Sequence, residues 1–357
     1  MDTMVKHRHS LSKNQKWVIA STSSGFALEN MDVLFLSFAM SSMIADLHLS
    51  GGVAGFISTI TNLGMLVGGI AFGIALIAEN FHKNQIGKMT SVAAIGGQIG
   101  AIMAALIAAW IIPTAGWHML FLVGIIPVIL TIFIRKHVHE SQQFVEAKEK
   151  EKGSLLSDVA KMMFSTPRLA WQTVGLMIMM TVQIAGYFGL MNWLPTIVQK
   201  QLDLNVSNSS LWMIATIVGM SIGMMTFGSI FDYFGPRRAF TIFLIGSALM
   251  VYTLSLAQNM ATLLVIGAIV GFFSNGMFGG YGAVISRLYP TEIRSSANNI
   301  IVNVGRAIGG FSSVVIGILM DKYNLSVVMG FLSALYIISF IVMVTLPGLK
   351  DLSKELN

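Results

Sequence analysis

Long apolar runs, each about the length of a membrane-crossing helix, recur along this 357-residue chain. An α-helix of about 20 apolar residues spans the hydrocarbon core of a bilayer. A soluble domain carries about 25% charged residues, whereas this chain has 11%. We therefore predict an all-α, polytopic membrane protein that resides in the cell membrane, with the lipid bilayer as its surroundings.

Ten such spans are expected, and their boundaries are marked by charged residues and by turn residues. The predicted spans are approximately residues 17–43, 52–78, 88–112, 117–135, 170–197, 208–231, 239–257, 260–286, 296–320 and 325–346.

Lysine and arginine are unevenly distributed over the loops between the spans. If the N-terminus is cytoplasmic, most of these residues fall on the cytoplasmic side, as the positive-inside rule requires. This predicts that both termini are cytoplasmic, and it explains the net charge of +6 without a nucleic-acid partner. The polar start of the chain favours a signal anchor over a cleaved signal peptide. The basic residues on the cytoplasmic side are Lys6, Arg8, Lys13, Lys16, Lys83, Lys88, Arg135, Lys136, Lys148, Lys150, Lys152, Lys161, Arg168, Arg237, Arg238, Arg287, Arg294, Lys350 and Lys354, whereas the opposite loops hold Lys200 and Lys322.

Several classes of chemistry find no support in the sequence. The chain has no cysteine, which excludes disulfides, thiolate metal sites and a cysteine nucleophile. No Walker motif is present, so ATP is not the expected energy source. The seven histidines have no spacing typical of metal ligands. We therefore expect neither an enzyme site nor a metal or cofactor.

One polar segment divides the chain. Residues 136–168 include the mixed-charge run Glu146–Lys152 and are predicted to form a cytoplasmic linker. The linker separates an N-terminal bundle of four spans, residues 1–135, from a C-terminal bundle of six spans, residues 169–357.

A short motif lies between the sixth and seventh spans, at Gly228-Ser-Ile-Phe-Asp-Tyr-Phe-Gly-Pro-Arg-Arg238. Gly228 allows close helix approach, Asp232 lies at a helix end, and Pro236 follows a glycine in a tight turn. Arg237 and Arg238 open the next helix. An acid and two arginines joined by a turn can form ion pairs that are made and broken at one membrane face.

Internal similarity indicates that the first half lacks residues that the second half has. Ala75–Phe81 matches Ala283–Tyr289 at a shift of 208 residues, whereas Phe72–Gly73 matches Phe227–Gly228 at a shift of 155. The shifts differ by 53 residues, which is about two helices with their loop. A fusion between Gly73 and Ile74 keeps the direction of every later span. Chance similarity is the alternative explanation, and the sequence leaves open whether such a deletion is natural, engineered or an error of the gene model.

The first span carries two acids, Glu29 and Asp32, at positions i and i+3 on one helix face. Carboxylates inside a membrane are costly and by default indicate function. We expect them to titrate with a transported proton or to pair with a cation. A wetted, structural position near a helix end is the alternative.

The fifth span combines polar, aromatic and helix-weakening residues. Pro195 and two glycines can weaken the helix near a binding site or gate. Two aromatic residues in the span either contact a substrate ring or gate, or belong to an interfacial aromatic belt. The candidate residues are Gln183, Tyr187, Asn192 and Trp193.

The ninth span carries Asn299, Asn303 and Arg306 at nearly helical spacing. A guanidinium in an apolar helix is expensive unless it has an anionic partner. That partner is either an acid of this chain, such as Glu29 or Asp32, or an anionic substrate.

Further charged residues are expected at the cytoplasmic face, where they can exchange partners as an inward gate. This candidate gate consists of Glu79, Asp232, Arg237, Arg238, Glu292 and Arg294.

These motifs resemble those of the major facilitator superfamily over nearly the whole chain. The loop motif is similar to the family's G-x-x-x-D-x-x-G-R-R, with Pro236 as a departure. Trp193–Thr196, Tyr289–Arg294 and Asn303–Arg306 resemble elements of its metabolite:proton symporters, especially the aromatic acid:proton symporters. The paired acids also resemble that branch, although its Asp-Gly-x-Asp reads Glu-Asn-Met-Asp here.

The resemblance implies a two-bundle fold with about ten helices, four plus six, instead of twelve. It also implies a monomeric secondary transporter that moves a small, anionic substrate together with protons by alternating access. An inactive remnant of a transporter and a drug or metabolite exporter of the same superfamily are the alternatives.

Overall fold

A computed structural model describes residues 11–68, 81, 83–137, 156–202, 205–290 and 293–355, and every regular element in these ranges is a helix. Two gate candidates, Glu79 and Glu292, lie outside the described residues, as does the predicted junction at Gly73. The helices are α1 (Lys13–Asp46), α2 (Gly51–Gly68), α4 (Lys83–His137), α6 (Leu156–Met163), α7 (Pro167–Leu202), α8 (Val206–Phe234), α9 (Pro236–Thr253), the 3₁₀ turn η1 (Leu254–Leu256), α10 (Met260–Gly276), α11 (Phe278–Leu288), α12 (Arg294–Gly309), α13 (Ser312–Lys322), α14 (Leu325–Thr345) and α15 (Pro347–Glu355).

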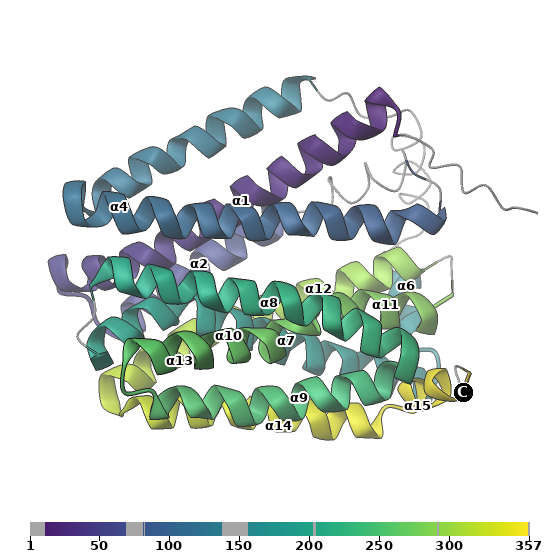
Figure 1. The fold of residues 1–357 in the computed structure, drawn as a ribbon. Helices are drawn as coiled ribbons and strands as arrows, with labels where there is room; N and C mark the ends of the chain where they lie inside the picture. Colours follow the sequence, from purple (N-terminus) through teal and green to yellow (C-terminus); the bar gives the residue numbers. More distant parts are fainter. Residues whose placement is uncertain are drawn as a thin grey trace, which may run out of the picture.

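Eight helical segments of the described chain are long and apolar enough to cross a membrane. The sequence predicts ten spans, and the difference between ten and eight arises at two places. The predicted second span corresponds to α2, which the structure describes only as far as Gly68. The predicted third and fourth spans form the two arms of α4, which reverse direction at Gly116 (Figure 1). Gly116 has φ 79°, a conformation that glycine adopts without steric cost.

Two membrane-crossing segments are interrupted near their middle. Met277 separates α10 from α11, and Gly310 with Phe311 separates α12 from α13. At both breaks the backbone keeps right-handed helical angles and the helix is only locally irregular. Transporters use irregular helices to build binding sites. The second break lies one turn beyond Arg306.

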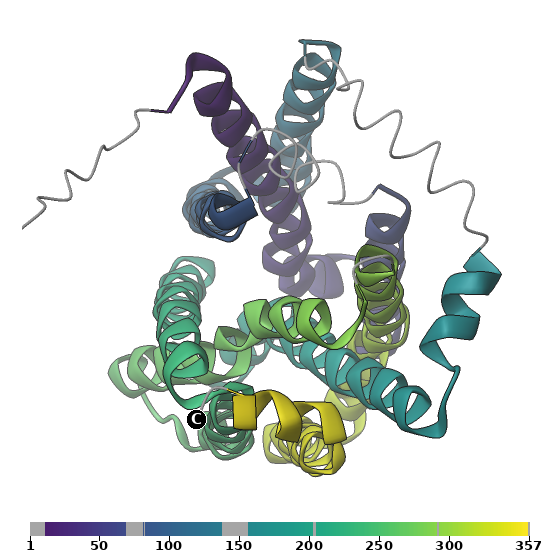
Figure 2. The same cartoon turned by 90° about the vertical axis from the view of Figure 1, so that its right-hand side faces the viewer.

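The helices form two groups (Figure 1). By chain order we assign α1, α2 and α4 to the first group and α7–α14, with α15 at the C-terminus, to the second, although α2 packs mainly on α13. Both views show α1 and α4 lying over one side of the second group (Figures 1 and 2). Within the groups α1 packs mainly on α4, α8 on α10, α7 on α12 and α9 on α14.

The two groups are joined at one end of the molecule. Contacts between them run from α2 to α13, from α1 to α7 and from α4 to α8. Among the described residues, every hydrogen bond between the groups lies in the halves of these helices that are remote from the chain termini. The molecule is therefore closed at the end opposite its termini.

Candidate functional site

Two opposite charges from the two groups lie within electrostatic reach of each other in the membrane-spanning region. Glu29 on α1 and Arg306 in the last turn of α12 are both half-buried and interact electrostatically. Within the described chain, no carboxylate oxygen lies within 4.0 Å of a nitrogen of Arg306. The guanidinium therefore has a nearby countercharge and retains donors that are not used in a direct ion pair.

Tyr187 on α7 completes this central cluster. Its ring is half-buried, lies within electrostatic reach of Glu29, and has its centroid 5.4 Å from that of the Phe188 ring. An acid, a guanidinium and a phenol from α1, α12 and α7 can bind an anion and a proton at one place.

The other charged or amide candidates near this cluster are more accessible. Asp32 is exposed and lies one turn from Glu29, opposite Gly124 on the second arm of α4. Asn299 and Asn303 are exposed on α12. The structure thus brings together Glu29, Tyr187 and Arg306. Asp32, Asn299 and Asn303 lie at the edge of this cluster.

The helix break beside Arg306 is held by the opposite group. The backbone N–H of Gly310 donates to the carbonyl of Arg306 at 2.9 Å, and the carbonyl of Gly310 accepts a hydrogen bond of 3.0 Å from Thr59 on α2. Thr59 is fully buried. The backbone next to Arg306 is therefore tied directly to the first group of helices.

Asn192 lies at the centre of a buried polar cluster rather than beside Glu29. Its carboxamide accepts a hydrogen bond from Ser37 on α1 at 3.0 Å and donates to Ser58 on α2 and Ser313 on α13. All four side chains are buried. Trp193 donates to the carbonyl of Ser313 at 3.0 Å and is 1% exposed, so it is not an interfacial belt residue.

Close backbone contact between α2 and α13 forms what we call the α2–α13 seam. A side chain at Gly55 would collide with the backbone of Ser313, and one at Gly317 would collide with the backbone of Gly51. Small residues allow membrane helices to pack this closely. Asp321 accepts hydrogen bonds from the backbone N–H groups of Gly51, at 2.9 Å, and Gly52, at 3.2 Å. It thereby caps the N-terminus of α2.

Gln183 belongs to the interior of the second group. It is fully buried and donates to the carbonyl of Ser274 at 2.9 Å and to the amide oxygen of Asn275 at 3.2 Å. These contacts hold α7 against α10, just before the break at Met277.

Among the described residues, Asp232 forms no ion pair with Arg238 or Arg294. Asp232 and Arg238 are exposed. Arg237 donates to the carbonyl of Val344, at the end of α14, at 3.2 Å. Arg294 is half-buried at the start of α12, and its Nε has no hydrogen-bond partner among the described residues.

A hydroxyl relay fixes α6 to the second group. Thr173 donates to the carbonyl of Met163, and the hydroxyl of Tyr289 lies 2.7 Å from Thr173 Oγ1. Since the Thr173 proton is already donated, Tyr289 is the donor of the second bond. Burial raises the pKa of Tyr289, so its hydroxyl stays protonated at neutral pH.

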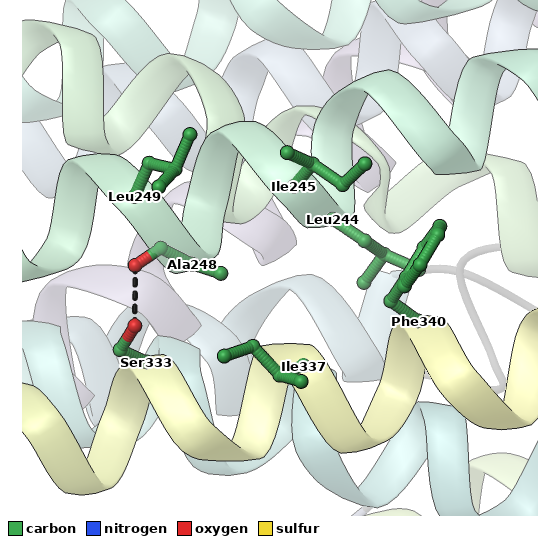
Figure 3. A pocket seen from close by; sticks show the side chains of 7 residues that line it. All are labelled: Leu244, Ile245, Ala248, Leu249, Ser333, Ile337 and Phe340. Atoms are coloured by element: carbon green, nitrogen blue, oxygen red, sulfur yellow. Dashed lines mark hydrogen bonds between the residues drawn. The ribbon is translucent and has the colours of Figure 1, made fainter.

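An apolar pocket between α9 and α14 is not suited to an organic anion (Figure 3). It has no charged residue, and its one side-chain hydroxyl, that of Ser333, donates to the carbonyl of Ala248. Its lining residues are Leu244, Ile245, Ala248, Leu249, Ser333, Ile337 and Phe340.

Two groups of membrane-crossing helices, joined at one end and sharing a central acid and arginine, define a helical membrane transporter and not an enzyme. The chain belongs to the Major Facilitator Superfamily, whose family model matches residues 68–223 and 197–355. It is accordingly a multi-pass protein of the cell membrane.

Individual relatives agree with this assignment. A Haemophilus influenzae protein that is named as a metabolite transport protein is 30% identical to this chain, and the alignment covers 91% of this chain and 94% of the relative. The cis,cis-muconate transport protein of Acinetobacter baylyi is 25% identical, over 88% and 91% of the two chains. In fold, the chain is similar to a D-xylose-proton symporter, with a TM-score of 0.72 and 17% identity, covering 94% of this chain and 98% of that one.

Proposed function

We propose that this chain is a proton-coupled symporter of a small organic acid. The observation that carries the proposal is the electrostatic proximity of Glu29 and Arg306 across the two helix groups. Arg306 would bind the substrate carboxylate, and Glu29 or Asp32 would take up the proton. Loss of that proton leaves a negative charge beside Arg306 that competes with the substrate and promotes its release.

Relatives support an organic acid as the substrate class. The Acinetobacter baylyi relative is named for cis,cis-muconate, which is a dicarboxylate. A carboxylate is the functional group that a guanidinium binds best, because the two can form paired, charge-assisted hydrogen bonds.

Alternating access would take place by movement of the two helix groups around Glu29 and Arg306. We place both termini in the cytoplasm on the basis of the loop charges. The α2–α13 seam then lies at the extracellular end, and the structure corresponds to a state that is closed toward the outside. The candidate gate residues Asp232, Arg237, Arg238 and Arg294, together with Glu79 and Glu292, would meet when the cytoplasmic end closes.

A second candidate is an inactive remnant that lacks two helices. The alignment with the Haemophilus influenzae relative is 384 positions long, more than the 357 residues of this chain, so the relative has residues without a counterpart here. This supports a deletion in this chain, which we place at Gly73–Ile74 on the basis of the internal similarity. Uptake by this chain, measured beside a version with 53 residues restored at the junction, separates a working transporter from a remnant.

The test of the function is uptake into proteoliposomes. Radiolabelled cis,cis-muconate, gallate and nicotinate are offered with and without an inward proton gradient. We expect at least one of them to accumulate only with the gradient, and we expect Arg306→Ala to abolish that accumulation. Arg287→Ala, which removes an exposed guanidinium from the end of α11, serves as the matched control. Gradient-driven uptake that survives Arg306→Ala would remove Arg306 from the mechanism.

A further inference from the structure

Asn62 on α2 is a buried amide without a hydrogen-bond partner. Its side chain is 3% exposed, and Nδ2 is among the buried polar atoms of the described chain that make no hydrogen bond. A buried donor without a partner destabilises a fold. Such a side chain therefore requires an explanation other than packing.

Asn62 faces the helix break that follows Arg306. It lies three residues after Thr59 and thus on the same face of α2. Thr59 donates to the carbonyl of Gly310 in that break. A Cβ atom added to Gly310 would lie 3.6 Å from Cβ of Asn62, so the two residues are in contact.

Arg306 and Gly310 are four residues apart and therefore on one face of the helix, and Asn62 contacts that face at Gly310. The N–H of Gly310 bonds the carbonyl of Arg306, which places the backbone of Arg306 next to the residue that Asn62 contacts. Arg306 makes no direct ion pair within the described chain. One carboxylate can accept about four hydrogen bonds, enough for a guanidinium and an amide together.

We propose that Asn62 is a second donor to the substrate carboxylate and binds it together with Arg306. This inference rests on the organic-acid transport proposed above. A carboxylate bound by both residues bridges α2 and α12, so the substrate itself links the two helix groups. A substrate analogue with a neutral group in place of the carboxylate would lose both contacts.

The first experiment measures stability without any substrate. Asn62→Leu replaces the amide with an apolar side chain of similar size, and thermal unfolding is followed in detergent. We expect the unfolding temperature to rise or stay equal, because an unpaired donor has been removed. A lower unfolding temperature would show that the amide supports the fold and would overturn the proposal. Thr61→Ala, on the exposed face of the same helix, is the control.

The second experiment measures equilibrium binding of radiolabelled cis,cis-muconate, gallate and nicotinate to the purified chain. We expect Asn62→Leu and Asn62→Asp to weaken binding by about tenfold or more, with Thr61→Ala unchanged. Nicotinamide should compete poorly against nicotinate in the unaltered chain. If Arg306→Ala abolishes binding while Asn62→Leu binds normally, the role of Asn62 is wrong and the proposed function stands. If the unaltered chain binds none of the three acids, the proposed function fails and this inference fails with it.

Discussion

At the level of single residues, the central feature is an acid and an arginine placed in opposite helix groups. Sequence reasoning finds Glu29 and Arg306 because a charge inside a membrane is rare and costly. It does not reveal that Thr59, Asn62 and Asn192 lie at the contact between the groups. Serine, threonine and asparagine also occur in membrane helices for packing, so their functional placement depends on contacts that only the fold defines.

Replacing Glu29 tests which group carries the proton. We expect Glu29→Gln to abolish accumulation driven by a proton gradient, because the side chain can no longer be deprotonated. Exchange of labelled for unlabelled substrate, which needs no net proton movement, should persist and become independent of pH. The measurement is uptake and counterflow in proteoliposomes between pH 5.5 and 8.

The matched variant is Asp32→Asn, which changes the exposed acid one turn away. If gradient-driven accumulation continues in Glu29→Gln but stops in Asp32→Asn, then Asp32 and not Glu29 carries the transported proton.

At the level of helices, the breaks and the ends carry most of the specific contacts. The glycines and the proline of the sequence indicate where helices can weaken. They do not indicate that the break at Gly310 is bonded by Thr59, because that contact joins residues 251 positions apart. The role of Asp321 was missed for the same reason. A carboxylate after a predicted span is typical of a solvated turn, and its partner helix begins 270 residues earlier in the chain.

The attachment of α6 is open to a direct test. Tyr289→Phe removes the donor to Thr173, and loss of one buried hydrogen bond costs about 1 kcal/mol. We expect the unfolding temperature in detergent to fall by a few degrees, and α6 to become more susceptible to proteolysis at Lys161. Since burial raises the pKa of Tyr289, the stabilisation should be complete below the ordinary tyrosine pKa, near pH 10. The stabilisation should decline as the pH rises through the raised pKa of Tyr289 in the folded chain.

Trp171→Phe changes an exposed aromatic residue of α7 and provides the comparison. Equal proteolysis of α6 in Tyr289→Phe and in the unaltered chain would contradict a role for this hydroxyl relay.

At the level of the whole molecule, the fold could be predicted more completely than the site. Apolar length, loop charges and the Gly228–Arg238 motif together indicate the fold class, since each reflects the bilayer and not a particular contact. The two arms of α4 agree with two predicted spans because the turn falls at a glycine, Gly116. The closure of one end by the α2–α13 seam has no comparable sequence signal, because glycine and serine are common throughout the chain.

A disulfide across that seam tests whether it must open during transport. Ser58→Cys combined with Ser313→Cys places two sulfur atoms where the hydroxyl oxygens lie 3.5 Å apart. The natural chain has no cysteine, so no other disulfide can form within it. We expect oxidation to stop uptake and reduction to restore it. Each single cysteine variant should be insensitive to both treatments, and uptake by the oxidised pair would show that the seam stays closed throughout.

The composition of the α2–α13 seam determines how this closed end responds to ionic strength. Salt screens interactions between exposed charges, whereas backbone contacts and neutral hydrogen bonds are little affected by it. Within the described residues, the seam combines backbone contacts at glycine, apolar contacts such as that of Gly52 with Ile318, and neutral hydrogen bonds, and Asp321 is its one charged contact. The strength of this closure should therefore vary little with ionic strength. A cell that meets changing salinity could keep this face sealed without adjusting the protein.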